Sequence, residues 1–407
     1  MATRETERGS SSSSSSQLPE DMIPEILARL PPKYLLRSRA VCKAWRDIAA
    51  DTEFIRKHHS HQPLQPLVLT RDVGPLKAVH LASNKCRVVL RVIVRVPIPL
   101  FFLHDARDAL MVHGSCGGLL LISFNKSFFV CNPATRQGAR LPLLLQNDLD
   151  VLGFYKHDDP GEYRVLYQQP DALQGWYSYH ILTVGSPQAR SIQLRTSSAD
   201  VAAGLARGLE SSCASPPVLF RDSLHWSPQE SQGGDILVFD RAAESFSRIS
   251  PPAEAMLIED DHTQLFEMEG KLAMFCWHQI ENKSVIWFMD NYEQMNWVKL
   301  SIKLAYQPIP LPPCPIVLYQ EGHMLIVLDP EEASNKLLHC YKTGKSHGFV
   351  DCSTRGIRIT PHMLKENLVL HEFLQNQRND GVCEWFPELE FADGSDTAIS
   401  GVETQTD

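Results

Sequence analysis

The chain has 407 residues, of which 43% are hydrophobic and 21% are charged, a composition typical of a globular protein with two or three domains. Its formal net charge of −9 argues against non-specific binding to nucleic acid or to an anionic membrane surface. No run approaches the roughly eighteen uncharged apolar residues that a membrane helix needs, so we expect no membrane partner.

The first 17 residues contain an unbroken serine run from Ser10 to Ser16 and few apolar side chains. Such a segment buries too little surface to offset its ordering entropy, so we predict that residues 1–17 are disordered. They have no apolar core and are not expected to form a signal peptide. None of the ten cysteines forms a CxxC pair, which favours reduced thiols in the cytoplasm and/or the nucleus.

Residues 18–60 predict three short helices. The first shows apolar residues at positions i, i+3, i+4 and i+7, namely Ile23, Ile26, Leu27 and Leu30. We expect Asp21 to be its N-cap, because Pro24 then occupies the first turn, where its missing N–H costs nothing.

Two prolines, Pro31 and Pro32, end this helix, and Val41, Trp45 and Ile48 repeat the helical spacing further on. Three short helices with this many apolar residues have too little core to enclose them, since chains below about forty residues usually need a partner or a staple. We therefore expect part of the apolar surface to bind another protein.

These residues resemble a known motif. The match consists of Leu18-Pro19-Glu20, Ile26-Leu27-Ala28-Arg29-Leu30-Pro31, Leu35-Leu36-Arg37 and Val41-Cys42-Lys43-Ala44-Trp45-Arg46. It closely resembles the plant form of the F-box, without a gap. The resemblance implies binding to a Skp-family adaptor and, through that adaptor, to a cullin-RING ubiquitin ligase scaffold.

We predict that twelve residues of the motif serve adaptor docking, although not all of them can face the adaptor, since some must hold the three helices together. They are Leu18, Pro19, Ile23, Ile26, Leu27, Leu30, Pro31, Leu35, Leu36, Val41, Cys42 and Trp45.

Residues 61–380 predict an all-β domain, because short strand-like runs alternate with Gly, Pro, Asn and Asp. The clearest runs are 67–70, 87–96, 119–124, 128–131, 163–167, 177–184, 235–239, 271–276, 285–289, 324–328 and 337–341. A loose repeat relates them: a turn, a buried strand, a second strand ending near Asn or Asp, and a final strand. A period near fifty residues is typical of a kelch-like β-propeller, and the segment has room for about six blades.

The run from Asn132 to Arg136 resembles the NPxTR signature of plant F-box-associated domains. Three further predictions concern this region and the end of the chain. Residues 200–210 form an inserted helix, residues 366–372 form a strand that pairs back into the propeller, and residues 381–407 form an acidic, mobile tail.

Signs of catalysis are weak. Residues 114–118 fit a thiol version of the nucleophile elbow, but an apolar strand rather than a helix follows, which favours a turn entering a blade. The histidines at 58, 59 and 61 have no second ligand cluster at metal-site spacing, so we expect a solvated junction there. We expect no catalytic residue, no metal and no cofactor.

The sequence therefore predicts a small all-α F-box followed by an all-β, propeller-like domain. Its predicted function is that of the substrate receptor of a Skp–cullin–F-box ubiquitin ligase, without catalytic activity of its own. Two alternatives stay open: a ligase-independent F-box scaffold, and a propeller that binds carbohydrate or a small ligand and whose F-box controls its turnover.

Overall fold

The computed structural model describes residues 19, 21–70, 76–82, 87–94, 110–124, 127–142, 149–157, 161–171, 175–196, 198–210, 215–229, 233–255, 262–278, 283–301, 316–320, 323–328, 336–341, 346–351, 357–375, 396–399 and 402–403. The chain divides into two compact units, residues 1–62 and residues 63–407. We call them the helical unit and the β unit. The predicted disordered segment 1–17 lies outside the described residues.

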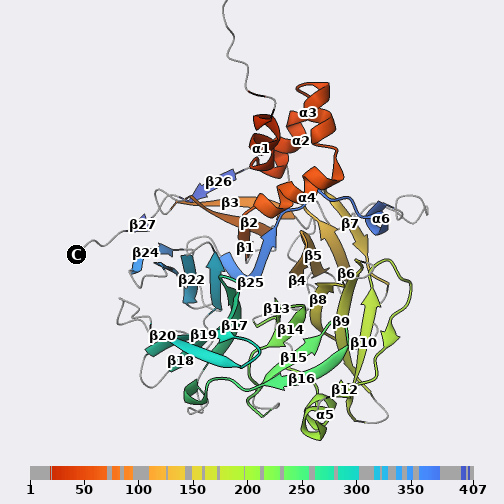
Figure 1. Ribbon diagram of the computed structural model, residues 1–407, viewed down its shortest axis with the longest axis vertical. Coiled ribbons are helices and arrows are strands. Elements are labelled where there is room, and N and C mark those ends of the chain that lie inside the picture. The colour runs from red at the N-terminus through yellow and green to blue at the C-terminus, as the bar shows by residue number, and fades with distance from the viewer. Residues whose placement is uncertain are drawn as a thin grey trace, which may run out of the picture. The chain divides into compact units, whose positions relative to one another are not determined.

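The helical unit contains four helices, one more than the sequence predicts (Figure 1). They are α1 (Met22–Ala28), α2 (Pro32–Ser38), α3 (Lys43–Ile48) and α4 (Thr52–His61). Helix α1 begins after Asp21 as predicted, although the Asp21 side chain makes no cap hydrogen bond. The Asp51 carboxylate does cap α4, since its Oδ1 accepts a hydrogen bond from the Phe54 backbone N–H at 2.7 Å.

In the β unit, the described strands form six sheets of four or five strands each. In spatial order, the first three are β25 (Ile357–Lys365), β1 (Leu64–Thr70), β2 (Leu76–Ala82), β3 (Arg87–Val94) and β26 (Asp396–Ile399); β4 (Met111–Cys116), β5 (Leu119–Phe124), β6 (Ser127–Asn132) and β7 (Gln137–Arg140); and β8 (Asp150–Lys156), β9 (Tyr163–Pro170), β10 (Tyr177–Thr183) and β11 (Arg190–Ser191).

The other three sheets follow in chain order. They are β13 (Val218–Phe220), β14 (Ser223–Trp226), β15 (Ile236–Asp240), β16 (Ser245–Ile249) and β12 (Arg195–Thr196); β17 (His262–Met268), β18 (Lys271–His278), β19 (Lys283–Asn291) and β20 (Asn296–Ser301); and β21 (Ile316–Gln320), β22 (His323–Leu328), β23 (Lys336–Tyr341), β24 (Ser346–Asp351) and β27 (Val402–Glu403). Each of the eleven strand-like runs singled out from the sequence overlaps one of these strands; residues 95–96 of one run lie outside the described residues. Helix α5 (Ala199–Ala206) overlaps the predicted inserted helix at 200–210 but ends four residues earlier, and α6 spans Glu372–Gln375.

The core of the β unit lies between neighbouring sheets. In β5, Leu119 and Leu121 belong to the cluster shared with the third sheet, whereas Leu120, Ile122 and Phe124 belong to the cluster shared with the first sheet. Both faces of this strand are buried, and this explains its continuous apolar sequence. First strands also contact one another from sheet to sheet, β25 with β4, β4 with β8, β13 with β17, β17 with β21 and β21 with β25. This is the arrangement of a propeller, and the prediction of an all-β, propeller-like domain is confirmed.

The Asn or Asp residue that ends the third strand of several sheets has a structural role. Asn132, Asp240 and Asn291 each end the third strand of a sheet, and their Oδ1 atoms accept hydrogen bonds from backbone N–H groups two or three residues later, at 2.8 to 3.3 Å. This contact stabilises the tight turn into the fourth strand.

The strand that closes the first sheet is β25, which pairs with β1, so the predicted pairing back occurs but not at residues 366–372. Those residues have no strand structure, and α6 begins at Glu372. The Asn132 Nδ2 atom donates to the Asn367 carbonyl at 3.0 Å, and the Asn367 Nδ2 atom donates to the Gly117 carbonyl at 2.9 Å. Hydrogen bonds from side-chain amides thus hold this segment, where a strand would have formed backbone hydrogen bonds with a neighbouring strand.

The same contact explains the predicted turn at Gly117 and Gly118. Both residues have positive φ, +58° and +86°, and a Cβ atom on Gly118 would lie 2.3 Å from the Cβ atom of Asn367. Only glycine allows both the backbone conformation and this close approach. The motif is therefore a turn between β4 and β5, as the sequence indicates, and not a nucleophile elbow.

The end of the chain differs from the prediction of a mobile tail. Strand β26 pairs with β3, and β27 pairs with β24. Residues 396–399 and 402–403 therefore extend two sheets by a fifth strand each.

Candidate interaction surface

The helical unit has a small core built on one face of α1. Leu27 and Ala28 in α1, Leu35 in α2 and Ala49 after α3 are buried, and α1 contacts α4. Phe54 of α4 is also buried. These side chains hold the four short helices together, since no single helix of this length is stable alone.

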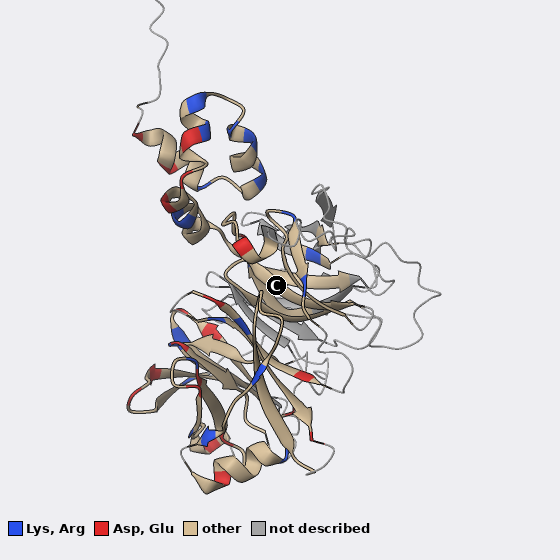
Figure 2. Ribbon diagram, turned by 90° about the vertical axis from the view of Figure 1, so that its right-hand side faces the viewer, with Lys and Arg blue, Asp and Glu red and all other residues tan. Residues whose placement is uncertain are grey.

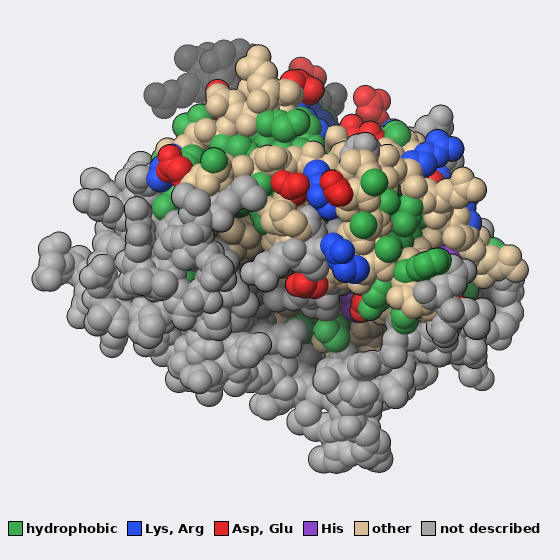
Figure 3. Space-filling model, turned by 90° about the horizontal axis from the view of Figure 1, so that it is seen from below, with side chains coloured by type: hydrophobic (Ala, Val, Ile, Leu, Met, Phe, Trp, Pro, Cys, Tyr) green, Lys and Arg blue, Asp and Glu red, His purple; other side chains and the backbone are tan. Residues whose placement is uncertain are grey.

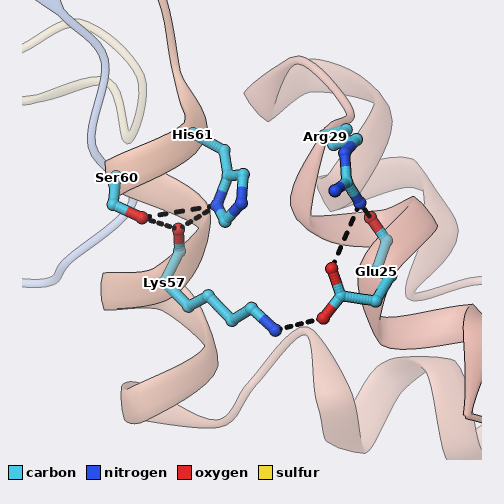
Figure 4. Close-up of polar contacts among 5 residues, drawn as sticks. All are labelled: Glu25, Arg29, Lys57, Ser60 and His61. Carbon is cyan, nitrogen blue, oxygen red and sulfur yellow. Dashed lines mark hydrogen bonds and ion pairs between the residues drawn. The ribbon is translucent and has the colours of Figure 1, made fainter.

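Polar contacts between α1 and α4 reinforce this core (Figure 4). The Lys57 ammonium forms an ion pair with the Glu25 carboxylate, and the Arg29 guanidinium contacts the same carboxylate at 3.2 Å. The hydrogen bond from Lys57, together with the charges of both cations, holds the pKa of Glu25 below its usual value. All three side chains are exposed, so their contribution to stability is small.

The end of α4 corrects the prediction of a solvated histidine junction in part, because His61 is exposed but His58 is not. His58 is fully buried, and its Nε2 atom lies 2.7 Å from the Leu30 carbonyl oxygen that closes α1. The Gln62 Nε2 atom donates to the same carbonyl at 3.2 Å. Burial lowers the pKa of His58, because the charged imidazolium loses its hydration, and the neighbouring His59 and His61 lower it further.

Exposed apolar side chains are concentrated in the first half of the helical unit's helices, α1, α2 and the turn after α2. Eleven large hydrophobic side chains are exposed among the described residues, and five of them lie between residues 22 and 41. We call these five the exposed apolar set: Met22, Ile26, Tyr34, Leu36 and Val41, with exposed fractions from 40% to 63%. The remaining six are spread over residues 64–370, and hydrophobic side chains visible in Figure 3 are interspersed with polar and charged ones.

The structure sorts the twelve predicted adaptor-binding residues by exposure. Ile26, Leu36, Val41, Cys42, Pro19 and Pro31 are exposed, and Ile23, Leu30 and Trp45 are half-buried. Leu18 lies outside the described residues. Leu27 and Leu35 have no exposed surface, so the structure places them in the core and not on the surface offered to a partner.

Two members of the exposed apolar set, Met22 and Tyr34, are absent from the sequence prediction. Met22 lies four residues before Ile26, so both side chains share the outer face of α1, while Ile23 and Leu27 share the inner one. The helical spacing could have identified Met22. For Tyr34, no comparable signal exists in the sequence.

The described residues contain no group of three or more His, Cys, Asp or Glu side chains that could hold a metal ion. Within the same residues, no helix is both long and apolar enough to cross a membrane.

Comparison with known proteins agrees with this architecture. Residues 15–57 match the F-box domain, and residues 103–322 match the F-box associated beta propeller domain. An F-box protein of Arabidopsis thaliana is 24% identical over 305 residues, which cover 70% of this chain and 78% of that protein. An F-box/kelch-repeat protein of the same plant is 25% identical over 311 residues, again 70% of this chain and 78% of that protein.

A third Arabidopsis F-box protein is 30% identical over 159 residues, 37% of this chain and 36% of that protein. The combination of an F-box with a β-propeller is that of a substrate-receptor type of F-box protein. The chain belongs to the plant F-box proteins that carry the F-box associated beta propeller domain.

Proposed function

We propose that this protein is the substrate-recognition subunit of a Skp–cullin–F-box ubiquitin ligase. Its helical unit binds a Skp-family adaptor, which connects it to the cullin-RING scaffold. Its β unit holds a target protein, so that ubiquitin transfer to the target occurs at high effective concentration. The chain itself performs no catalytic step.

The observation that carries this proposal is the exposed apolar set. Each large apolar side chain left in water forgoes about 1.5–3 kcal/mol of burial free energy. Five such side chains within twenty residues of a small helical unit indicate a surface that a partner protein covers. Aromatic and aliphatic anchors of this kind supply most of the binding free energy in protein interfaces.

The β unit supports the second half of the proposal. We propose that its six sheets are the blades of one ring. The ring closes where β1, the first strand of the β unit, pairs with the late strand β25 in a single sheet. A ring leaves few exposed sheet edges and presents loops to a target, and loops are where binding residues concentrate. Cys42, Cys116, Cys131 and Cys276 are in no disulfide, which favours action in the cytoplasm or the nucleus.

The test is quantitative binding of the full chain to purified Skp-family adaptor. A Leu36→Ala, Val41→Ala double variant removes two exposed anchors, so we expect affinity to fall about thirtyfold or more. Isothermal calorimetry would measure this change, and circular dichroism would establish that the variant is folded.

The β unit offers a matched control. Leu219 and Val298 are also exposed, and a Leu219→Ala, Val298→Ala double variant deletes the same atoms elsewhere in the chain. It should bind the adaptor as the parent does. Equal affinity of the Leu36, Val41 variant would contradict the assigned surface, and an adaptor complex that never recruits cullin would contradict the ligase role.

A further inference from the structure

The helical unit carries a concentration of positive charge in one stretch of its sequence. Lys33, Arg37, Arg39, Lys43 and Arg46 are the only charged residues from 33 to 46, so this stretch has five positive and no negative charges, a net +5 in a chain of net −9. Lys33 is half-buried and the other four are exposed. The charged positions are coloured in Figure 2.

This positive charge borders the exposed apolar set. The Arg37 guanidinium lies 5.9 Å from the centroid of the exposed Tyr34 ring, so a cation and an anchor share one patch of surface. The Arg46 Nε atom donates to the Arg39 carbonyl at 3.2 Å, which keeps these two residues together at the turn that carries Val41. Apolar and basic groups therefore reach a partner together.

Two acidic residues of the unit have partners outside the basic stretch. Glu25 is paired with Lys57 and Arg29 between α1 and α4, as Figure 4 shows, and Asp51 caps α4. The nearest acidic residue to the basic stretch is Asp47 at the end of α3. Neither α2 nor the turn after it contains an acidic residue that could neutralise the basic groups.

We infer that the partner of this surface is a protein with an apolar groove bordered by acidic residues, and that long-range attraction accelerates their association. The inference rests on the proposed function and names the chemistry that the adaptor must present. An interface brings opposite charges together because like charges cost several kcal/mol, and steering by charge acts mainly on the association rate.

A protein fits these observations better than other anionic partners. Phosphate groups of nucleic acid would satisfy the basic side chains but leave the exposed apolar set in water. Helices α2 and α3 have seven and six residues, much shorter than helices that lie in a membrane interface.

The experiment is stopped-flow association of the full chain with a Skp-family adaptor at low salt, about 0.05 M, and at high salt, about 0.5 M. We expect the parent's association rate to fall about tenfold between these conditions. An Arg37→Gln, Arg39→Gln, Lys43→Gln variant should associate about tenfold more slowly at low salt and respond little to added salt. Its dissociation rate should change much less, because the apolar anchors remain.

A control changes the same net charge elsewhere. Arg56, Arg195 and Arg207 are exposed and lie outside the basic stretch, so their triple glutamine variant should associate nearly as the parent does. If this control is slowed equally, or if the parent's rate is independent of salt, the inference is overturned while apolar binding through Leu36 and Val41 still stands.

Two further results separate the alternatives. The assignment of a protein partner would be overturned if the chain bound RNA or phosphatidylserine vesicles as tightly as it binds the adaptor, and if the Arg37, Arg39, Lys43 variant lost that binding. No adaptor binding at any salt concentration would overturn the proposed function together with this inference.

Discussion

The two units use apolar residues in opposite ways. In the β unit, strand β5 is buried on both faces, because a neighbouring sheet covers each side. In the helical unit, α1 buries Leu27 and leaves Met22 and Ile26 exposed, because the unit has only enough elements to cover one face. The same kind of sequence therefore makes a self-sufficient core in one unit and a surface for a partner in the other.

The two units also differ in the contacts that stabilise them. In the described part of the β unit, buried side chains form four clusters, and each cluster joins two neighbouring sheets. In the helical unit, a few buried side chains, exposed ion pairs and one buried histidine join the helices. We expect the helical unit to be the less stable of the two and to gain stability from its partner.

The largest expected effect comes from replacing one leucine by alanine in each unit. Leu120→Ala removes a side chain with no exposed surface, so the β unit should lose about 2–5 kcal/mol of unfolding free energy. Leu36→Ala removes one that is 40% exposed, so unfolding should change by no more than about 0.5 kcal/mol while adaptor binding weakens. Chemical denaturation measures both. Equal destabilisation would mean that Leu36 is a core residue.

A smaller effect is expected from the amide that holds the C-terminal segment. Asn132→Ala removes the donor to the Asn367 and Val369 carbonyls, at 3.0 and 3.4 Å, and leaves part of a buried segment unpaired. The β unit should lose about 1–3 kcal/mol of unfolding free energy. Hydrogen exchange should also rise between residues 366 and 371.

Asn291→Ala is the control for this change. Asn291 caps a turn in the same way, accepting from the Gln294 N–H at 3.0 Å, but it ends β19, in a different sheet from Asn132. Its variant should be destabilised less and leave exchange at residues 366–371 unchanged. Equal effects of the two variants would show that turn capping, not the C-terminal contact, is what Asn132 contributes.

Local pattern predicted most of the fold. The β5 and β6 sequences were recognisable because strands buried on both faces are continuously apolar. Helix α4 was not predicted, because Phe54 is the only large hydrophobic side chain that it buries. Residues 366–372 read as a strand because they include Leu368, Val369 and Leu370. The hydrogen bonds that decide their structure come from Asn132, more than two hundred residues away.

The candidate site was predicted as a motif but not as a surface. The F-box resemblance identified which residues matter, whereas the choice between core and surface depends on which face of each helix meets its neighbours. Ile23 and Leu27 lie on one face of α1, and Met22 and Ile26 lie on the other. A resemblance to a motif alone does not make that distinction, so Leu27 and Leu35 were assigned to binding and Met22 and Tyr34 were omitted.

The smallest expected effect is the pH dependence that a buried histidine gives to the helical unit. Burial lowers the pKa of His58 in the folded chain, while in the unfolded chain it is near 6.5. Well above pH 6.5 the residue is neutral in both states. As the pH falls below 6.5 the unfolded chain takes up a proton first, so the helical unit loses stability until the folded pKa is reached, by about 1.4 kcal/mol for each unit of pKa difference.

His58→Gln keeps a donor for the Leu30 carbonyl and removes the titration. Hydrogen exchange of α1 and α4, corrected for intrinsic rates, should therefore accelerate between pH 7.5 and pH 5.5 in the parent by more than in the variant. The β unit has its own buried histidines, such as His362 with a pKa lowered to about 3, so the comparison must be made on the α1 and α4 amides. Identical pH responses of parent and variant would show that the docking of α4 on α1 does not depend on a neutral His58.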